Sequence, residues 1–257
     1  MRARLAVVVP VFDEAAGIRP TLAALAAQRD EDFDAVFVDN GSRDGSADVI
    51  RAFADEHGRT RWRIVDEPQK GTGAAADTGM RSAIAAGATL LARTDADCLP
   101  RADWTAAVRR SLTARAEGGL GLRLVGGELV PRRDEGLGWG TRALLRGAVE
   151  LAEAFGRLRP GNRDPAALGP YLMAAGCNVA ITAELYLAAG GFPRTAIEDL
   201  HEDRALVNAV RRLTPDYARR RDVVVHGSSR RVRAWGLRNT LLWYKDHAYR
   251  PPVVDIR

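Results

Sequence analysis

Short apolar runs alternate with helical patterns over the first hundred residues, and this alternation most narrows the possible folds. Residues 5–11 form an unbroken apolar run, Leu-Ala-Val-Val-Val-Pro-Val, which predicts a strand that ends at Pro10 and is buried on both faces. The alternation continues with helices over 15–27, 47–57 and 74–86 and strands through Val38, over 62–65 and over 88–94. This rhythm predicts an α/β fold with ligand-binding groups at the carboxyl ends of the strands.

The pattern becomes less regular after Pro100. We expect an amphipathic helix from Trp104 to Leu112, a strand over 120–130, a mixed region over 136–170, a short strand over 177–181, a helix closed by Gly190 and Gly191, and a helix over 201–213. No linker is long enough to separate domains. The sequence therefore predicts one domain over residues 1–257, with a nucleotide-sized half over 1–100 and a variable half over 101–257.

Composition indicates a folded globular protein. The chain has 257 residues, of which 46% are hydrophobic and 28% charged, so it can bury a full core. The apolar run near the N-terminus is too short for a signal-peptide core or a membrane span, and we expect a cytoplasmic protein without a transmembrane segment. Cys98 and Cys177 lack metal-binding spacing and are expected to be reduced thiols.

The positive charge does not predict a nucleic-acid partner. The net charge is +5, but the arginines are spread along an alanine- and glycine-rich chain and no nucleic-acid motif accompanies them. We therefore expect no nucleic-acid binding, although the positive balance would help to hold a small anionic substrate.

Five acidic residues follow predicted strands and need an explanation: Asp13, Glu14, Asp39, Asp95 and Asp97. If the chain stays extended after Thr94, Asp95 and Asp97 project to the same side, because side-chain direction repeats every two residues in a strand. Two such carboxylates suit Mg²⁺ or Mn²⁺, whose remaining positions are filled by water and phosphate oxygens. The alternative is that these aspartates only cap a loop.

Two further loops are ambiguous when taken alone. The stretch "VDNGSRDGS" contains ordinary turn dipeptides, yet Asp39 at the end of a central strand could accept hydrogen bonds from a uracil or ribose. The stretch "KGTGAAADTG" opens a helix but lacks a phosphate-loop or dinucleotide-binding signature.

Six motifs together resemble a known family. "VVVPVFDE", "FVDNGSRDGS", "KGTGAAADTGM", "TDAD", "GCNVAITAELYLAAGGF" and "HEDRAL" occur in the order and approximate spacing of the family 2 glycosyltransferases, which are inverting enzymes with the GT-A fold. The resemblance spans residue 5 to about residue 235. It implies a Rossmann-like GT-A domain with a mostly parallel central sheet, a nucleotide-sugar donor, most often a UDP-sugar, and Mn²⁺ or Mg²⁺ as cofactor.

The resemblance also implies roles for individual residues on the donor side. The nucleoside would be held by Pro10, Phe12, Glu14 and Asp39, with Lys70 and Gly71 of the glycine-containing loop also at the nucleotide. Asp95 would face the ribose or sugar, and Asp97 would bind the metal that bridges the diphosphate. One departure bears on the identity of the donor. The loop that often ends in Arg-Asn in relatives here ends in Ala76-Asp77, so one expected contact to the nucleotide or sugar is missing or replaced.

An acidic residue at the start of a late helix is the base that the resemblance implies. Two pairs compete, Glu198-Asp199 and Glu202-Asp203. The second pair directly precedes a clean amphipathic helix, so we assign Asp203 as general base and Glu202 as its neighbour at the acceptor. The alternative for either pair is an acidic first turn that stabilises the helix dipole.

The last candidates lie in the second half. His226 ends a predicted strand and, by the resemblance, would complete the metal shell, although a lone histidine is more often structural. Arg230 and Arg231 would clamp the diphosphate. Trp139 and Tyr171 would stack on an acceptor sugar or, as is commoner for aromatics, fill the core.

The sequence therefore predicts a metal-dependent inverting glycosyltransferase that acts on an acceptor hydroxyl, with a small molecule or a lipid-linked sugar as the acceptor. Two alternatives stay open. A nucleotidyltransferase of related fold would need a basic, glycine-rich loop after the first strand, where this chain has "PVFDEAAGIRP". A catalytically inactive sugar-nucleotide-binding module would have lost a metal or base carboxylate.

Overall fold

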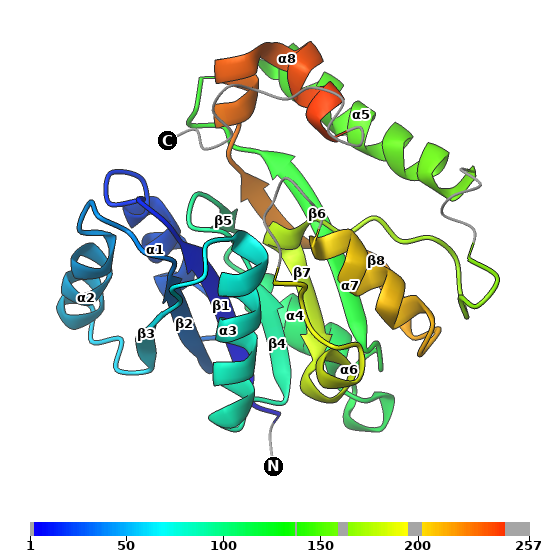
Figure 1. Cartoon of the computed structure of the whole chain (residues 1–257), viewed down its shortest axis with the longest axis horizontal. Helices are drawn as coiled ribbons and strands as arrows, with labels where there is room; N and C mark the ends of the chain where they lie inside the picture. The colour runs from blue at the N-terminus through cyan, green and yellow to red at the C-terminus, as the bar shows by residue number, and fades with distance from the viewer. Residues whose placement is uncertain (1–2, 137, 159–163, 195–201, 245–257) are drawn as a thin grey trace.

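The protein folds around one eight-stranded sheet. A computed structural model describes residues 3–136, 138–158, 164–194 and 202–244, and among them the strand order is β3-β2-β1-β4-β7-β6-β8-β5 (Figure 1). Strands from both halves of the chain share this sheet. The predicted α/β fold with a mostly parallel central sheet is confirmed.

The first half supplies the parallel part of the sheet. Strand β1 pairs in parallel with β2 and β4, and β2 pairs in parallel with β3. The elements in chain order are β1 (Leu5–Val11), α1 (Arg19–Ala26), β2 (Phe33–Asp39), α2 (Ser46–Glu56), β3 (Trp62–Asp66), α3 (Thr72–Ala85) and β4 (Leu90–Arg93). Their carboxyl ends therefore meet at one edge of the sheet, as the sequence pattern predicts.

The second half completes the sheet with mixed pairing. Strand β7 runs antiparallel to both β4 and β6, and β6 runs parallel to β8. The elements are β5 (Leu99–Pro100), α4 (Trp104–Leu112), the 3₁₀ turn η1 (Arg115–Glu117), β6 (Leu124–Pro131), α5 (Trp139–Leu158), the 3₁₀ turn η3 (Gly176–Asn178), β7 (Val179–Thr182), α6 (Ala183–Ala188), α7 (Glu202–Arg211), β8 (Tyr217–Gly227) and α8 (Arg230–Tyr244).

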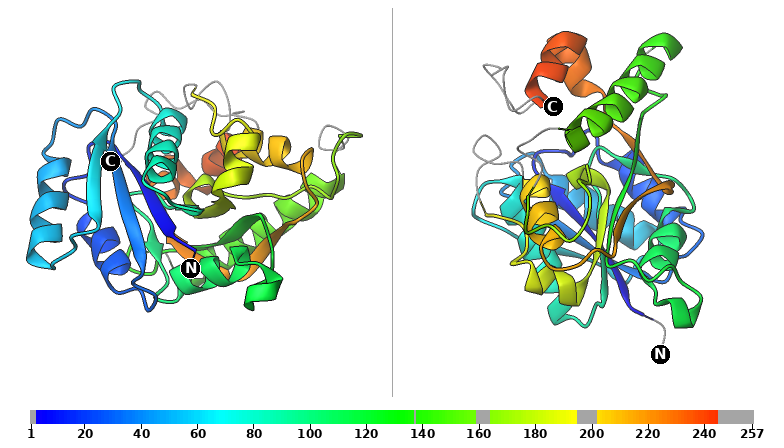
Figure 2. Two further views of the ribbon diagram at one scale, coloured as in Figure 1. Left: turned by 90° about the horizontal axis from the view of Figure 1, so that it is seen from below. Right: turned by 90° about the vertical axis from the view of Figure 1, so that its right-hand side faces the viewer.

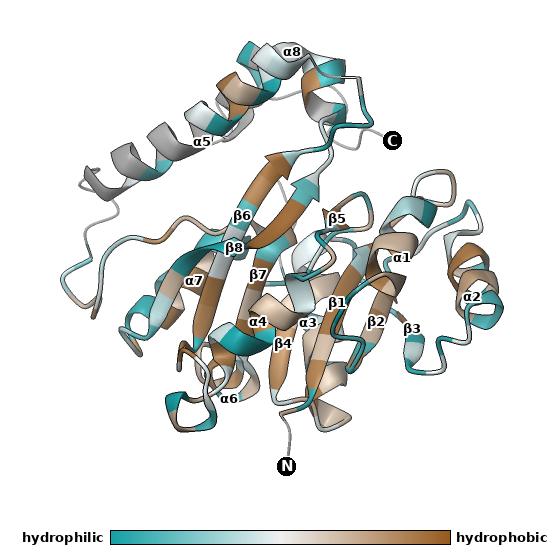
Figure 3. Ribbon diagram, turned by 180° about the vertical axis from the view of Figure 1, so that it is seen from behind, coloured by the Kyte–Doolittle hydropathy of each residue, from teal (hydrophilic) through white to brown (hydrophobic). Residues whose placement is uncertain are grey.

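Each face of the sheet has its own apolar core. Helices α1, α2 and α4 pack on one face around Val7 and Val9, and helices α3, α6 and α7 pack on the other around Ala6 and Val8. Figure 3 shows the apolar strands between these two layers. Burial of alternate residues of β1 on opposite faces explains why its sequence is apolar throughout.

Helices α5 and α8 lie beside each other at one end of the molecule, beyond β6 and β8 (Figures 1 and 2). Trp139, the first residue of α5, is 81% exposed, so it does not fill the core. Within the described ranges, the structure contains no helix that combines the length and the apolar character needed to span a bilayer.

Two element boundaries differ from the expected ones for local reasons. Residues 15–18 form a turn on the carbonyl of Glu14, and α1 begins only at Arg19, with Pro20 in its first turn. Strand β6 begins at Leu124 rather than at residue 120, because the amides of Leu120 and Leu122 donate to carbonyls of α4 instead of to the sheet.

Gly79 of α3 has no room for a larger side chain. A Cβ there would lie 2.4 Å from Val8 Cγ1 and 2.7 Å from Val38 Cγ2. We expect Gly79→Ala to lower the free energy of unfolding by about 1–3 kcal/mol through overpacking. Gly147→Ala in α5, where a Cβ meets nothing within 4 Å, should instead be neutral or stabilise by about 0.5–1 kcal/mol. Urea unfolding of both variants checks this, and equal effects would contradict it.

Candidate active site

The carboxyl edge of the sheet gathers the acidic residues that the sequence singled out. Pro10 lies within β1, Glu14 follows that strand, and Asp39 ends β2. Asp95 and Asp97 follow β4, the other parallel neighbour of β1. Residues from three adjacent strands therefore surround one position above the sheet.

The loop after β1 is held in an unusual backbone conformation. Asp13 has a φ of 47°, a left-handed value that non-glycine residues rarely adopt. Its amide donates to Ser42 Oγ (3.0 Å), and its Oδ1 accepts from the amide of Arg43 (2.6 Å). The amide of Glu14 donates to Ser46 Oγ (2.7 Å). The stretch "NGSRDGS" is therefore a turn whose side chains fix the loop that carries Glu14.

Asn40 is a positioning residue that the sequence analysis did not identify. It is 7% exposed, and its Nδ2 donates to the carbonyls of Glu67 (2.8 Å) and Gln69 (2.7 Å). Its Oδ1 accepts from the amide of Gly71 (2.9 Å), which precedes α3. The Asn-Gly dipeptide reads as a turn, so nothing in the sequence marks these three bonds.

The glycine-containing loop reaches the same edge. The ammonium of Lys70 lies 5.0 Å from the ring centroid of Phe12, so the two residues predicted at the nucleotide are neighbours. Asp77 has a different role, because it is 2% exposed and accepts hydrogen bonds from Tyr186 Oη (2.9 Å) and Arg81 Nε. Asp77, which stands where relatives often have asparagine, therefore contributes to the packing of α3 against α6.

The chain does not stay extended after Thr94, which was the condition for Asp95 and Asp97 to project to the same side as alternate residues of a strand. Strand β4 ends at Arg93, and the chain then turns, with the amide of Cys98 donating to the carbonyl of Asp95 (3.1 Å). The turn sends the two carboxylates to different partners. Asp95 accepts from Arg93, whereas Asp97 accepts from Arg230.

Arg230, at the start of α8, bridges Glu14, which was predicted at the nucleotide, and Asp97, which was predicted at the metal. Its Nη2 donates to Glu14 Oε1 (2.6 Å) and to Asp97 Oδ2 (2.8 Å), and its Nη1 donates to Glu14 Oε2 (3.1 Å). A cationic group therefore already lies between these two carboxylates. Arg231 belongs to the same turn of α8.

A hard divalent cation is compatible with this arrangement. The guanidinium of Arg230 shows that the carboxylates of Glu14 and Asp97 can share one cation, and carboxylate oxygens are the protein ligands that Mg²⁺ and Mn²⁺ prefer. Across the ranges that the structure describes, no three His, Cys, Asp or Glu side chains form a ready metal cage. Asp97 would therefore depend on water and substrate oxygens for the remaining positions.

His226 is not grouped with Asp95 and Asp97 in the described structure. It lies in β8 opposite Leu99 of β5. Burial, followed by the charges of Arg133 and Arg101, lowers the pKa of His226, which keeps its imidazole neutral near pH 7. Its role as a metal ligand stays a prediction.

The second group of carboxylates surrounds Arg93, which is 1% exposed. Its Nη2 lies 3.2 Å from Asp95 Oδ1, and its Nη1 and Nη2 each lie 3.3 Å from Glu202 Oε1. Burial raises the pKa of Asp95, while the charge of Arg93 opposes that rise.

Asp203, beside Glu202, is the carboxylate of this group whose pKa is raised toward neutrality. Its Oδ2 accepts from the amide of Gly176 (3.0 Å), and its Oδ1 accepts from the amide of Arg204 (2.6 Å). Burial, with a contribution from the neighbouring charge of Glu202, raises the pKa of Asp203 to about 6. The competing pair Glu198-Asp199 lies outside the described residues.

Of the two candidate acceptor aromatics, only Tyr171 lies near this group. Its ring centroid is 5.8 Å from the guanidinium carbon of Arg211, and the charges of Arg204 and Asp203 act on its hydroxyl. Burial raises the pKa of Tyr171. Trp139 lies at the exposed start of α5.

Comparisons with known proteins place this geometry in a family. Residues 6–133, about half of the chain, match the model of glycosyl transferase family 2. Glycosyltransferase AglE of Haloferax volcanii is 33% identical over 127 residues, which are 49% of this chain and 39% of AglE. The chain thus spans well under half the length of that relative.

Solved structures share the fold at low identity. The mannosyltransferase PcManGT from Pyrobaculum calidifontis, in complex with GDP-Man and Mn²⁺, aligns with a TM-score of 0.64 and 23% identity over 91% of this chain and 60% of its own. TarS 1-349 of S. aureus, in complex with UDP, aligns with a TM-score of 0.60 and 12% identity over 89% of this chain and 61% of its own.

The sheet order and the acidic carboxyl edge thus define a GT-A glycosyltransferase fold. The chain belongs to glycosyl transferase family 2, which confirms the family predicted from its motifs.

Removal of the Asn40 side chain should loosen the loop that precedes α3. In Asn40→Ala the amide of Gly71 loses its acceptor, and we expect its hydrogen exchange to accelerate by at least about tenfold, because a lost buried hydrogen bond costs about 1–3 kcal/mol. Gln28→Ala is the matched control, since Gln28 is 2% exposed and bonds the carbonyl of Arg101. Unchanged exchange at Gly71 in Asn40→Ala would contradict the assigned role.

Proposed function

We propose that the protein is a metal-dependent, inverting glycosyltransferase that moves a sugar from a nucleotide donor, a UDP-sugar, to an acceptor hydroxyl. One observation carries this proposal: Arg93 ties the carboxylate of Asp95 to that of Glu202, whose neighbour Asp203 has a pKa raised to about 6. The proposed donor-binding groups and the proposed base would thereby be joined through Arg93.

The donor would lie along the carboxyl ends of β1, β2 and β4. Phe12, Glu14 and Asp39 would face the nucleoside, with Lys70 and Gly71 closing one side. The family neighbours in complex with GDP-Man and with UDP support a nucleotide-sugar donor. Asp95 would face the ribose or the sugar.

Asp97 would hold the divalent metal, with His226 as a second ligand in the donor-bound state. Bound Mn²⁺ or Mg²⁺ would neutralise the diphosphate that leaves. The Mn²⁺ in the PcManGT complex supports this cofactor class. Arg230 and Arg231 would bind the diphosphate oxygens, for which the planar fork of arginine is well suited.

Asp203 would remove the proton from the acceptor hydroxyl as that oxygen attacks the anomeric carbon from the face opposite the diphosphate. A base with a pKa near 6 is largely ionised at neutral pH and can still accept a proton efficiently. Glu202 would orient the acceptor from the same turn of α7. Tyr171 is the aromatic residue best placed to contact it.

The whole chain would act as one catalytic unit. Residues 1–100 would form the half that binds the nucleotide sugar, and residues 101–257 would form the half that binds the acceptor and carries the base. The two alternatives are less well supported, because the loop after β1 is acidic rather than basic, and both Asp97 and Asp203 are present. A cytoplasmic location stays a prediction from the sequence.

Nucleotide binding tests the donor side. We expect titration calorimetry to show that one of UDP, GDP or dTDP binds much more tightly in the presence of Mn²⁺, and that Asp97→Ala removes this metal dependence because it removes the carboxylate ligand. Glu31→Ala, at an exposed acid just before β2 and so at the opposite edge of the sheet, is the control and should bind as the wild type does. Failure of all three nucleotides to bind would reject the proposed function.

Release of the nucleoside diphosphate tests the base. Asp203→Asn should lower kcat by about 10²–10⁴-fold, because the amide cannot accept the proton, while nucleotide affinity stays unchanged. In the wild type, kcat should fall about tenfold per pH unit below about pH 6, since protonation of Asp203 removes the base. A variant with full activity, or with pyrophosphate as the product, would contradict this assignment.

A further inference from the structure

Arg93 lies deeper than any substrate-binding group and still touches both halves of the proposed site. It ends β4, is 1% exposed, and donates to Asp95 on the donor side and to Glu202 on the acceptor side. A buried charge of this kind is expensive unless it is paired and hydrogen-bonded. Arg93 is therefore held by its carboxylate partners inside the protein and is not part of a surface ion pair.

The surroundings of Arg93 also reach the base. A Cβ on Gly176 would lie 3.1 Å from Arg93 Nη1 and 3.2 Å from its Cζ, so the guanidinium packs directly against the Gly176 backbone. The amide of Gly176 donates to Asp203 Oδ2 at 3.0 Å. The peptide that orients Asp203 is thus supported by the guanidinium of Arg93.

A third contact fixes the plane of the guanidinium. The Cζ of Arg93 lies 5.2 Å from the ring centroid of Phe192, which is 2% exposed. The amide of Phe192 donates to Tyr186 Oη (3.0 Å). A planar fork held against an aromatic ring can bond two carboxylates in fixed directions, which a single ammonium cannot do.

The charges that face Asp203 come from several elements. Glu202 lies beside it in α7, Arg93 approaches from β4, and the hydroxyl of Tyr171 approaches from the segment before η3. Cys177 of η3 faces Arg93. Arg93 is a cationic side chain that acts on Asp203, and its charge opposes both burial and the negative charge of Glu202.

We propose that Arg93 is a positioning residue for glycosyl transfer: its buried guanidinium joins donor-side Asp95 to acceptor-side Glu202 and keeps Asp203 oriented and ionised. This inference rests on the proposed function. It assigns Arg93 no contact with substrate, and its effect on the reaction is exerted through the three carboxylates.

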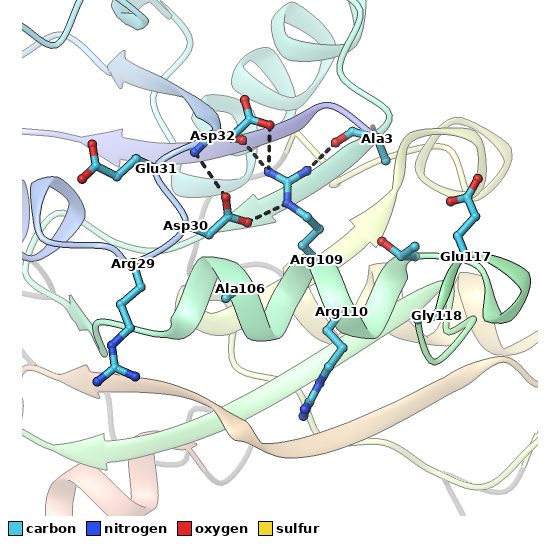
Figure 4. Close-up of a pocket in the computed structure, with 12 residues that line it drawn as sticks. Ala3, Arg29, Asp30, Glu31, Asp32, Ala106, Arg109, Arg110, Glu117 and Gly118 are labelled. Atoms are coloured by element: carbon cyan, nitrogen blue, oxygen red, sulfur yellow. Dashed lines mark hydrogen bonds and ion pairs between the residues drawn. The ribbon is translucent and has the colours of Figure 1, made fainter. Parts of the chain in front are cut away.

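Arg109 provides a matched control at the opposite edge of the sheet. It is 8% exposed, its Nε donates to Asp30 Oδ2 (2.6 Å), and its other nitrogens donate to the carbonyls of Ala3 and Asp32 (Figure 4). Ala3 and Asp32 precede β1 and β2, so this buried arginine lies at the amino ends of the parallel strands, far from the proposed site. Its loss affects the fold but not the carboxylates around Asp203.

The test compares Arg93→Met and Arg93→Lys with Arg109→Met and Arg109→Lys. The readouts are the pH profile of kcat and the ¹³C carboxyl titration of Asp203 in the ligand-free protein, with Asp203→Asn used for the assignment. The charge of Arg93 lowers the pKa of Asp203, and loss of an opposite charge within about 4–6 Å shifts a carboxyl pKa by about 1–3 units. In Arg93→Met we expect the acid limb of the profile and the Asp203 titration to move up together by about one unit or more.

Arg93→Lys keeps the positive charge but loses the planar guanidinium. It provides the test if the methionine variant does not fold. We expect it to lower kcat by at least about tenfold, with a smaller shift of the acid limb, while Arg109→Lys changes thermal stability alone. Wild-type titration and kcat in either folded Arg93 variant, or equal shifts in the Arg109 variants, would overturn the inference. A wild type that turns over no donor rejects the proposed function instead, whatever the titration of Asp203 shows.

Discussion

The buried guanidinium of Arg93 is the interaction around which the proposed site is organised. A full charge with 1% exposure is tolerated only where carboxylates surround it, and the fold supplies them from two distant parts of the chain, Asp95 after β4 and Glu202 at the start of α7. Several local features follow from it. A Cβ at residue 176 would lie 3.1 Å from Arg93 Nη1, so a larger residue there would have to displace the guanidinium. The turn after β4 brings Asp95 to Arg93, while Asp97 accepts from Arg230.

The donor side depends on a different kind of support, in which side chains hold backbone groups. Ser42 and Ser46 fix the loop after β1, and Asn40 fixes the loop before α3. Each of these polar side chains replaces a backbone partner that an irregular loop lacks. The groups that would contact a nucleotide are thus carried on loops with little freedom, although none of those loops belongs to regular secondary structure.

The sequence predicts the sheet edge better than the directions of its side chains. Strands buried on both faces are apolar throughout and stop abruptly, so the placement of Glu14, Asp39 and Asp97 at one edge follows from the pattern. The orientation of Asp95 does not follow from the pattern, because it depends on the turn after β4, for which the sequence gives no signal. Arg93 reads as an ordinary strand end, and its partner Glu202 lies 109 positions away. Asn40 reads as half of a turn dipeptide. Long-range partners of this kind leave no periodic signal in a single sequence.

The bridge from Arg230 to Glu14 and Asp97 has a thermodynamic consequence. A ligand that binds Glu14, Asp97 or the guanidinium of Arg230 must compete with the three hydrogen bonds that join these side chains. The apparent dissociation constant of such a ligand is therefore larger than its intrinsic one. It equals the intrinsic constant divided by the fraction of molecules in which the bridge is open. Added salt weakens the partly exposed bridge as well as the ligand contacts. Ionic strength would therefore change the measured affinity less than the charges of the ligand alone imply.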